Sequence, residues 1–352
     1  MAKSGWVILD KGSGMGSRWA GNQVRKIFGA ETFGHIGTLD PMASGVLPIA
    51  LGEATKMIPY LPAGRKVYEF GVVFGVKTDT DDVMGRVMMR SPVGHPRFGK
   101  PLRGLCHPSR EWPGMTDIEK VLPGFIGKIM QVPPAYSAVH INGVRAYKLA
   151  RAGKSVEIPA REVEIYKLEV VSPAATNPEQ IGIPACAGMT MMVECSQGTY
   201  VRSLARDIAA ALGTICAVDM IRRVDSGGFS IKNAIRLEKL KELVDNGGNE
   251  SDGIGSASPH RKIASRFFDS PARGELWEGG ILMPIDYGLD GIPVLNLDSV
   301  QARLFRNGGF VDINAGNYER PCIFRIYNDD EFVGIGEVRE GMLRPKRVIN
   351  NG

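Results

Sequence analysis

Residues 34–50 read GHIGTLDPMASGVLPIA, and the chain is organised around this stretch. It contains one carboxylate, Asp40, followed directly by Pro41. The glycines around Asp40 permit positive φ, while Pro41 fixes its own φ and disfavours a helical conformation at Asp40. Asp40 is therefore expected on a constrained turn, where loops present reactive side chains. On these residues alone, a structural Asp-Pro turn with a capping carboxylate is the favoured interpretation, because that is the commoner use of such a sequence.

The stretch also carries a family signature. Residues 34–48 resemble the pattern GHxGxLDPxAxGxLP of the TruB family of tRNA pseudouridine synthases, with nearly every constrained position filled. The resemblance implies that Asp40 is the catalytic aspartate and that the substrate is uridine 55 of the tRNA T-loop. It also implies a reaction without a cofactor. Residues 46–51 (VLPIAL) are expected to form a buried strand that anchors the turn.

Length and composition favour an ordinary globular protein with two domains. The chain has 352 residues, of which 43% are hydrophobic and 23% charged. A net charge of +5 suits a polyanionic partner without proving one. Five cysteines, an odd number with no Cys-x-x-Cys pair, argue against a disulfide framework. The N-terminal apolar run is too short for a signal peptide or a membrane span, so we expect a cytoplasmic protein.

A Gly-rich turn follows a short expected strand at residues 7–9. It is no Walker motif, because Lys11 precedes the glycines and no Gly-Lys-Ser/Thr follows. The segment resembles the family's first motif, LDKPxGxSS, with Gly12 and Gly16 replacing a proline and a serine. The resemblance implies that Lys11 contacts the substrate strand; a solvated surface lysine is the alternative. Ser17 is the expected N-cap of a helix that ends at Gly29.

Residues 66–76 alternate between apolar and other side chains, which predicts a strand. Tyr68 stands in the first position of its apolar face, so packing in the core is one interpretation. The resemblance implies instead that Tyr68, 28 residues after Asp40, stacks on the target base. A phenol can also act as an acid or a base through its hydroxyl.

Two stretches could suggest a metal site, and we expect neither to hold one. Residues 77–82 (KTDTDD) carry three carboxylates but fail the calcium-loop pattern, because Val83 occupies a ligand position and the required glycine is missing. This TDTxD run resembles a structural hallmark of the family. Cys106 and His107 are adjacent, but no second pair lies at ligand spacing.

Residues 195–208 (CSQGTYVRSLARDI) resemble the family motif SxGTYxRxLxxDxG. A helix is expected from residue 201 to Leu212, with Arg202 and Arg206 on one face. The resemblance implies that Arg202 pairs with the catalytic carboxylate and that Tyr200 lines the uracil pocket. An arginine partner would keep a shielded carboxylate ionised. A solvated arginine and a core tyrosine are the alternatives.

Two further side chains complete the expected site. Residues 220–229 resemble the run LRRTxxGxF, which places Ile221 at the leucine that walls the family's pocket. We expect His35 to fill the space that the flipped nucleotide leaves, because the base must leave the stack to react. Asp40 could attack the sugar, attack the ring or remove a sugar proton, and the sequence does not decide among these routes.

Several segments are expected to be scaffold. Residues 131–138 (QVPPAYSA) resemble another family motif and suggest a stiff support, followed by a hairpin turn at Asn142-Gly143 and a helix at 146–152. Irregular runs at 91–115 and 174–190, both ending near Gly-Met-Thr, are expected to be inserted surface loops. Between these two runs, Thr116 and Glu119 suggest a capping box at the start of a short helix.

The C-terminal part is expected to be a separate small module. A linker or insertion at 246–280, rich in Gly, Ser and Asn over 246–258 and irregular over 259–280, separates a catalytic domain, 1–245, from residues 281–352. There we expect a helix at 299–306 and strands at 322–327, 332–338 and 342–349. The segment resembles the family's PUA-like RNA-binding domain, although an ordinary folded domain fits nearly as well. Its basic residues are Arg339, Arg344, Lys346 and Arg347.

The expected fold class is therefore mixed α/β (α+β), with a long, mostly antiparallel sheet. The expected partner is the T-arm stem-loop of tRNA, bound by a monomer with no membrane and no obligatory protein partner. Two alternatives remain: a tRNA-binding chaperone that has lost catalysis, and a guide-RNA-dependent pseudouridine synthase. The expected catalytic residues are Asp40, Tyr68 and Arg202, and the expected substrate-binding residues are Lys11, His35, Tyr68, Tyr200 and Ile221.

Overall fold

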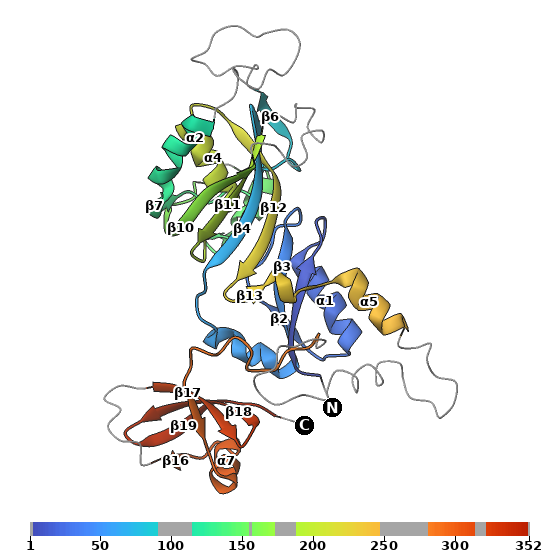
Figure 1. The fold of residues 1–352 in the computed structure, drawn as a ribbon, viewed down its shortest axis with the longest axis vertical. Helices are drawn as coiled ribbons and strands as arrows, with labels where there is room; N and C mark the ends of the chain where they lie inside the picture. Colours follow the sequence, from blue (N-terminus) through green and yellow to red (C-terminus); the bar gives the residue numbers. More distant parts are fainter. Residues whose placement is uncertain are drawn as a thin grey trace. The chain divides into compact units, whose positions relative to one another are not determined.

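The computed structural model describes residues 3–90, 115–154, 157–172, 188–246, 281–313 and 322–350. The chain divides into two compact units, each built from segments distant in the sequence (Figure 1). Unit 1 comprises Met1–Asp40, Val46–Pro62 and Gly227–Gly352, and unit 2 comprises Pro41–Gly45 and Ala63–Ser226. The strand that follows Asp40 begins in unit 2 and continues into unit 1.

Unit 2 is built on a sheet in the order β12-β4-β11-β10-β7. These strands are Cys216–Ser226, Lys66–Phe74, Gly188–Cys195, Arg161–Ser172 and Gly127–Gln131. Every neighbouring pair among them is antiparallel. The first residues of β3 (Ser44–Leu51) add a short parallel pairing, Ser44 with Arg222 and Gly45 with Arg223. The predicted mixed α/β fold with a long, mostly antiparallel sheet is confirmed.

Short elements surround this sheet. Helix α4 (Val201–Ala211) packs on β4 and β12, burying its apolar residues (Figure 1). A tight hairpin joins β8 (His140–Ile141) to β9 (Val144–Arg145), and its Asn142 and Gly143 have φ of 50° and 80°. Both central residues are left-handed, as a type I′ turn requires, so the predicted Asn-Gly turn is confirmed. The remaining elements are β5 (Val76–Thr78), β6 (Val87–Arg90), α2 (Met115–Val121), η2 (Leu122–Phe125) and α3 (Ala146–Arg151).

Unit 1 contains the Gly-rich turn that follows Lys11 and the first part of the signature stretch, up to Asp40. Its strands are β1 (Gly5–Lys11), β2 (Phe33–His35), most of β3, β13 (Phe229–Ser230) and β14 (Ile235–Arg236). Strands β1 and β14 are parallel, and β2 pairs antiparallel with β3. The helices are α1 (Ser17–Phe28), η1 (Gly52–Tyr60), η5 (Ile231–Asn233) and α5 (Leu237–Asn246). Trp6, Ile8, Val46, Met57 and Phe229 form the buried core between them.

The C-terminal segment forms a β-rich domain with its own core. Its sheet has the order β15-β17-β18-β19-β16. The strands are Val294–Asn296, Cys322–Asn328, Glu331–Arg339, Met342–Val348 and Val311–Asp312. Helix α7 (Ser299–Arg306) begins with a capping box between Asp298 and Gln301 and buries Phe305 against the strands. The predicted helix and the three predicted strands are confirmed, while the predicted linker at 246–280 lies almost wholly outside the described residues.

Two element boundaries differ from the sequence prediction. The strand predicted at 66–76 ends at Phe74, because Gly75 has φ of 82° and turns the chain before β5 begins. Ser17 is not the N-cap of α1: Gly16 occupies that position without a side-chain bond, and the Ser17 hydroxyl has another partner.

The Gly-Met-Thr sequences that end the two irregular runs differ in structure. Met115 begins helix α2, so Thr116 lies inside that helix and cannot be its N-cap. Residues 188–190, predicted as surface loop, open strand β11, and Met189 and Thr190 are buried by pairing with β4. The prediction that residues 188–190 belong to an inserted surface loop is therefore wrong. The remainder of both runs lies outside the described residues.

Gly45 is required where β3 meets β12. It has φ of +98°, and a Cβ there would lie 2.1 Å from the carbonyl oxygen of Arg223. Gly45→Ala should therefore lower the free energy of unfolding by clearly more than the ~1–3 kcal/mol of backbone strain alone. The matched control is Gly198→Ala, which has φ of +95° but open space around its Cβ position. Urea unfolding checks the difference, and equal losses for the two variants would contradict the close approach.

Candidate active site

The turn that carries Asp40 is fixed by a buried hydroxyl from helix α1. Ser17 Oγ donates to the carbonyl oxygen of Leu39 at 2.8 Å and accepts from the Leu39 N–H at 2.9 Å. Both residues are buried. One side chain thus satisfies both backbone polar groups of the residue that precedes Asp40, while Gly37, with φ of 63°, reverses the chain before it. The Asp40 carboxylate, which is partly buried, is presented by a rigid bend.

His35 reaches the same turn from a strand. It is the last residue of β2 and pairs with Ile49 of β3, so its backbone is held by the sheet of unit 1. Its side chain is half-buried. Its predicted role in filling the space of a flipped nucleotide stays a prediction.

Lys11 is part of the interior of unit 1. It is fully buried at the end of β1, and its Nζ donates to the carbonyl oxygens of Gly12 and Met15 at 2.9 and 2.8 Å. The alternative of a solvated surface lysine is therefore wrong. The ammonium closes the Gly-rich turn from inside and places a positive charge at the start of α1. Its contact with a substrate strand stays a prediction.

In unit 2, the sheet brings Tyr68 and Ile221 to one face. Tyr68 on β4 lies opposite Arg223 of β12, and Phe70 lies opposite Ile221. Residues two apart on a strand point to the same side, so Tyr68 and Ile221 are diagonal neighbours. Both side chains are buried, at 7% and 5% exposure. A phenol ring beside an aliphatic side chain is a surface on which a planar base can stack.

Arg202 is held in one position by three groups from two separate loops. Its Nη1 donates to the carbonyl oxygen of Thr80 at 2.8 Å and lies 3.7 Å from Asp82 Oδ2. Its Nη2 donates to the carbonyl oxygen of Tyr136 at 3.0 Å. With 3% exposure, Arg202 is not a solvated arginine. The TDTDD and Pro-Pro segments are thus scaffold for the start of α4, as the sequence predicted.

Tyr200 stands at the N-cap of α4 and is half-buried. Its N–H donates to Gln131 Oε1 at 2.8 Å, which ties the helix start to the end of β7. The ring packs against a small apolar cluster of Val139, Ala146 and Ile158. This contact is what a core tyrosine would make, and lining a base pocket stays a prediction.

The carboxylates of residues 77–82 serve the local turn. Asp79 Oδ1 accepts from the Arg86 N–H at 2.8 Å, and Asp82 Oδ1 accepts from Thr80 Oγ1 and the Met84 N–H at 2.8 and 3.0 Å. Asp81 pairs with Arg206 at 3.0 Å. Across the described ranges, no three His, Cys, Asp or Glu side chains are grouped as metal ligands would be. Cys106 and His107 lie outside those ranges.

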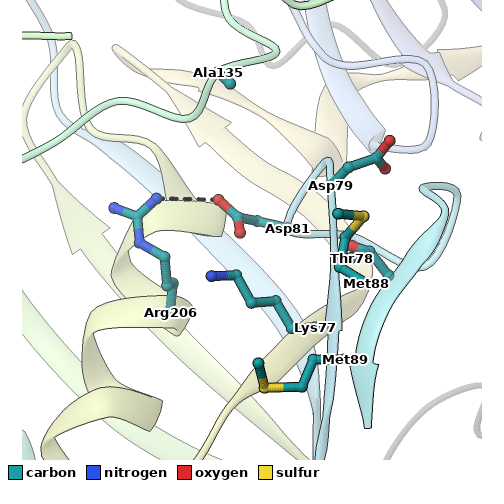
Figure 2. Close-up of a pocket in the computed structure, with 8 residues that line it drawn as sticks. All are labelled: Lys77, Thr78, Asp79, Asp81, Met88, Met89, Ala135 and Arg206. Atoms are coloured by element: carbon teal, nitrogen blue, oxygen red, sulfur yellow. Dashed lines mark hydrogen bonds and ion pairs between the residues drawn. The ribbon is translucent and has the colours of Figure 1, made fainter. Parts of the chain in front are cut away.

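A cavity of about 480 Å³ opens beside the Arg206–Asp81 pair. Figure 2 shows the arginine of α4 reaching Asp81, with Lys77 and the methionines of β6 around the same space. The lining residues are Lys77, Thr78, Asp79, Asp81, Met88, Met89, Ala135 and Arg206. Because none of the predicted site residues is among them, this cavity is not the basis of the site.

Two residues of interest were not found from the sequence. The clamp of Ser17 on Leu39 joins positions 22 apart, and no local pattern signals it. Lys66 could have been noticed from the sequence, because it lies two residues before Tyr68 and therefore shares a strand face with the buried side chains of β4. Burial and the nearby Arg223 lower the Lys66 pKa to about 8.

Comparison with known proteins identifies the family. Residues 25–100 and 106–201 match the family described as TruB family pseudouridylate synthase (N terminal domain). Residues 293–349 match the family described as Pseudouridine synthase II TruB, C-terminal. The helices of the described segments are all too short or too polar to cross a membrane.

The relatives match over nearly the whole chain. A tRNA pseudouridine synthase B from Brucella ovis is 37% identical over 359 residues, covering 99% of this chain and 96% of the relative. One from Ehrlichia chaffeensis is 36% identical over 349 residues, covering 98% and 99%. Among solved structures, a chain of a Cbf5-Nop10-Gar1 complex has a TM-score of 0.60 at 22% identity, covering 98% of this chain and 84% of that one. At that identity the likeness shows the fold.

The Ser17 clamp can be tested through stability. Ser17→Ala would leave the N–H and carbonyl of Leu39 buried without this partner, so the free energy of unfolding should fall by about 1–3 kcal/mol. Ser299→Ala is the matched control, because Ser299 is also the first residue of a helix but is exposed. Ser17→Thr, which keeps the hydroxyl, should recover most of the loss in urea unfolding. Equal stability of Ser17→Ala and Ser299→Ala would rule the clamp out.

Proposed function

The chain belongs to the TruB family of pseudouridine synthases, and from this premise we propose that it converts uridine 55 in the T-loop of tRNA to pseudouridine. The full-length likeness to tRNA pseudouridine synthases B carries the proposal, because it spans both the catalytic and the C-terminal parts. The rigid turn under Asp40 supports it independently, since a scaffold that fixes a single carboxylate so firmly is suited to chemistry.

The reaction is an isomerisation and needs no external reactant. The bond between N1 of uracil and C1′ of the sugar breaks, the freed ring rotates, and C5 forms a new bond to C1′. The proton on C5 is released, and N1 gains one. Because these atoms are shielded in a stacked nucleotide, the uridine must first leave the stack.

Asp40 is the proposed catalytic carboxylate. Aspartate is normally ionised at neutral pH and can serve as nucleophile or base. Attack on C1′, attack on the ring and removal of a sugar proton all require that negative charge. Arg202 is the proposed partner of the carboxylate, because the planar fork of a guanidinium matches the geometry of a carboxylate. The bonds from Arg202 to Thr80 and Tyr136 support this role, because they leave the guanidinium little freedom to move.

Tyr68, Ile221 and Tyr200 are the proposed walls of the uracil pocket. Tyr68 and Ile221 are supported by their position on one face of the sheet. His35 is proposed to occupy the space that the flipped nucleotide leaves, and Lys11 to act near the substrate strand. For Lys11 the buried carbonyl contacts favour an indirect contribution through the shape of the Gly-rich turn.

The C-terminal domain is the proposed second contact with tRNA. Its basic residues are not all available, because Arg339 and Lys346 lie 2.6 and 3.1 Å from Glu337. These hydrogen bonds, that from Arg339 foremost, lower the pKa of Glu337 and keep it anionic. We therefore assign this domain a supporting share of tRNA affinity. The proposed enzyme acts as a cytoplasmic monomer on free tRNA.

The guide-RNA-dependent alternative rests on likeness to Cbf5 chains, and that likeness shows the fold alone. A silent RNA chaperone is the other alternative. One assay separates the three: release of tritium from C5-labelled uridine in transcript tRNA, with the modified position mapped. The proposed enzyme should act on bare transcript at position 55, and a uridine-to-cytidine change there should abolish release.

Asp40→Asn keeps the shape of the side chain and removes its charge. The turnover rate should fall by at least about 10³-fold in the tritium assay, while tRNA binding persists. Asp290→Asn is the matched control, because its side chain is 91% exposed. Near wild-type turnover by Asp40→Asn would refute the assignment of this carboxylate.

Tyr68→Phe separates the ring from the hydroxyl. We expect Tyr68→Phe to bind tRNA as wild type does but to turn over about 10²-fold or more slowly, because the phenol is proposed to move a proton. Tyr68→Leu should in addition weaken binding through the loss of stacking. Titration of tRNA binding alongside single-turnover rates checks both effects. A fully active Phe variant would reduce the role of Tyr68 to stacking.

A further inference from the structure

Lys66 occupies a position in the sheet of unit 2 where an apolar side chain would be expected. It is the first residue of β4 and shares a face with Tyr68 and Phe70, which are both buried. In register, it lies opposite Cys195 of β11 and Ser226 of β12. Arg223, which is fully buried, stands opposite Tyr68 on the same face.

Among the described residues, no anion pairs with the ammonium of Lys66. In the segments that the structure describes, its Nζ forms neither an ion pair nor a hydrogen bond. The exposed lysines of β7 and β10 in the same sheet differ, since Lys128 and Lys167 pair with Glu162 and Glu169 at 3.1 and 2.7 Å. Desolvation, and then repulsion from Arg223, lowers the pKa of Lys66 to about 8. Burial raises the pKa of the Cys195 thiol to about 11, so this neighbour is neutral and offers no countercharge.

Lys66 is half-buried, and a cation that is partly removed from water without a countercharge is costly to a fold, so such a position is a candidate for ligand binding. Two cations on one face, Lys66 and Arg223, select an anion as that ligand. The proposed substrate carries one phosphate for every nucleotide. A phosphate beside the flipped uridine would come within reach of the face that holds Tyr68.

We propose that Lys66 is a phosphate-binding residue, whose ammonium receives a backbone phosphate of the RNA strand next to the uridine that stacks on Tyr68. This inference rests on the proposed function, from which it takes the identity of the strand. Arg223 contributes positive potential from the facing strand. The Lys66 ammonium thus positions the flipped nucleotide by binding its backbone phosphate, while Tyr68 stacks on the base.

The dependence of tRNA affinity on salt tests this directly. Each phosphate contact that forms on binding releases condensed counterions from the RNA, and so contributes about 0.7–0.9 to the magnitude of the slope of log K against log salt concentration. Lys66→Gln should lower the magnitude of that slope by this amount and weaken binding roughly tenfold, the loss expected for one charge-assisted hydrogen bond. Lys167→Gln is the matched control, with the same change in net charge at a side chain that is 62% exposed. An unchanged slope and affinity for Lys66→Gln would overturn the proposal.

The pH dependence of binding gives a second signature. Below pH 8 the free protein carries the Lys66 proton, and above it the proton must be taken up on binding, so tRNA affinity should fall as pH rises from 7 to 9. The facing Cys195 thiol does not titrate in this range, because burial raises its pKa to about 11, and the other charged side chain on this face is the guanidinium of Arg223. Lys66→Arg should keep the salt slope and lose this fall. An equal fall in Lys66→Arg would assign the titration elsewhere and contradict the inference.

Stability separates a ligand-binding lysine from a structural one. Lys66→Met removes a half-buried cation that has no ion-pair partner among the described residues, so it should unfold at a higher temperature than wild type at pH 7 while binding tRNA more weakly. A structural lysine would give the opposite sign. A Lys66→Gln variant with normal affinity and a lost turnover rate would identify a general base and overturn phosphate binding.

The outcomes distinguish this inference from the proposed function. If wild type forms no pseudouridine but its tRNA affinity still depends on Lys66, the function fails and the phosphate contact stands. If wild type is active while Lys66→Gln binds with an unchanged salt slope, the function stands and the phosphate contact fails.

Discussion

One buried hydroxyl fixes the element on which this protein depends. Ser17 binds the N–H and the carbonyl of Leu39 together, so the residue before Asp40 cannot rotate without breaking two bonds in the interior. The clamp links the first turn of α1 to the turn that carries Asp40, so two motifs that are separate in the sequence form one structural unit. A catalytic group must be held to within a fraction of an ångström, and a loop held only by its own backbone does not provide this. The rigidity of the Asp40 turn thus depends on a tertiary contact, the one between Ser17 and Leu39.

Lys11 and Arg202, which are buried, and Lys66, which is half-buried, serve different purposes, and their partners distinguish them. Lys11 and Arg202 both donate to backbone carbonyls, and Arg202 also lies 3.7 Å from Asp82 Oδ2. Both side chains therefore hold nearby loops in place. Lys66 lacks such partners among the described residues, and the lowered pKa is the consequence of its burial beside Arg223. Fastened cations shape a site, whereas a cation without a countercharge is suited to receive a ligand.

The chemistry of the proposed reaction explains why the scaffold has this form. An isomerisation that moves a glycosidic bond within one nucleotide needs a charge, a flat surface and room for a ring to turn. The antiparallel sheet supplies the surface through Tyr68 and Ile221, which face the same way because they lie on adjacent strands in register. The loops of residues 77–82 and 131–138 supply no chemistry; they converge on α4 and hold its first arginine.

The local sequence was sufficient to predict those features that depend only on residues close together in the chain. The alternation after Lys66, the Asn142-Gly143 turn, the helix at 299–306 and the glycine stop after α1 each follow from backbone preferences or side-chain periodicity within a few residues, and the structure has them all. The signature around Asp40 also identified the family before any fold was known. Tertiary structure decided the rest, because each remaining feature depends on a partner far along the chain. Ser17 bonds to Leu39 instead of capping α1, Lys11 is buried, and residues 188–190 form part of a strand because they pair with β4. A sequence specifies which groups need partners, but only the folded chain determines which distant groups meet them.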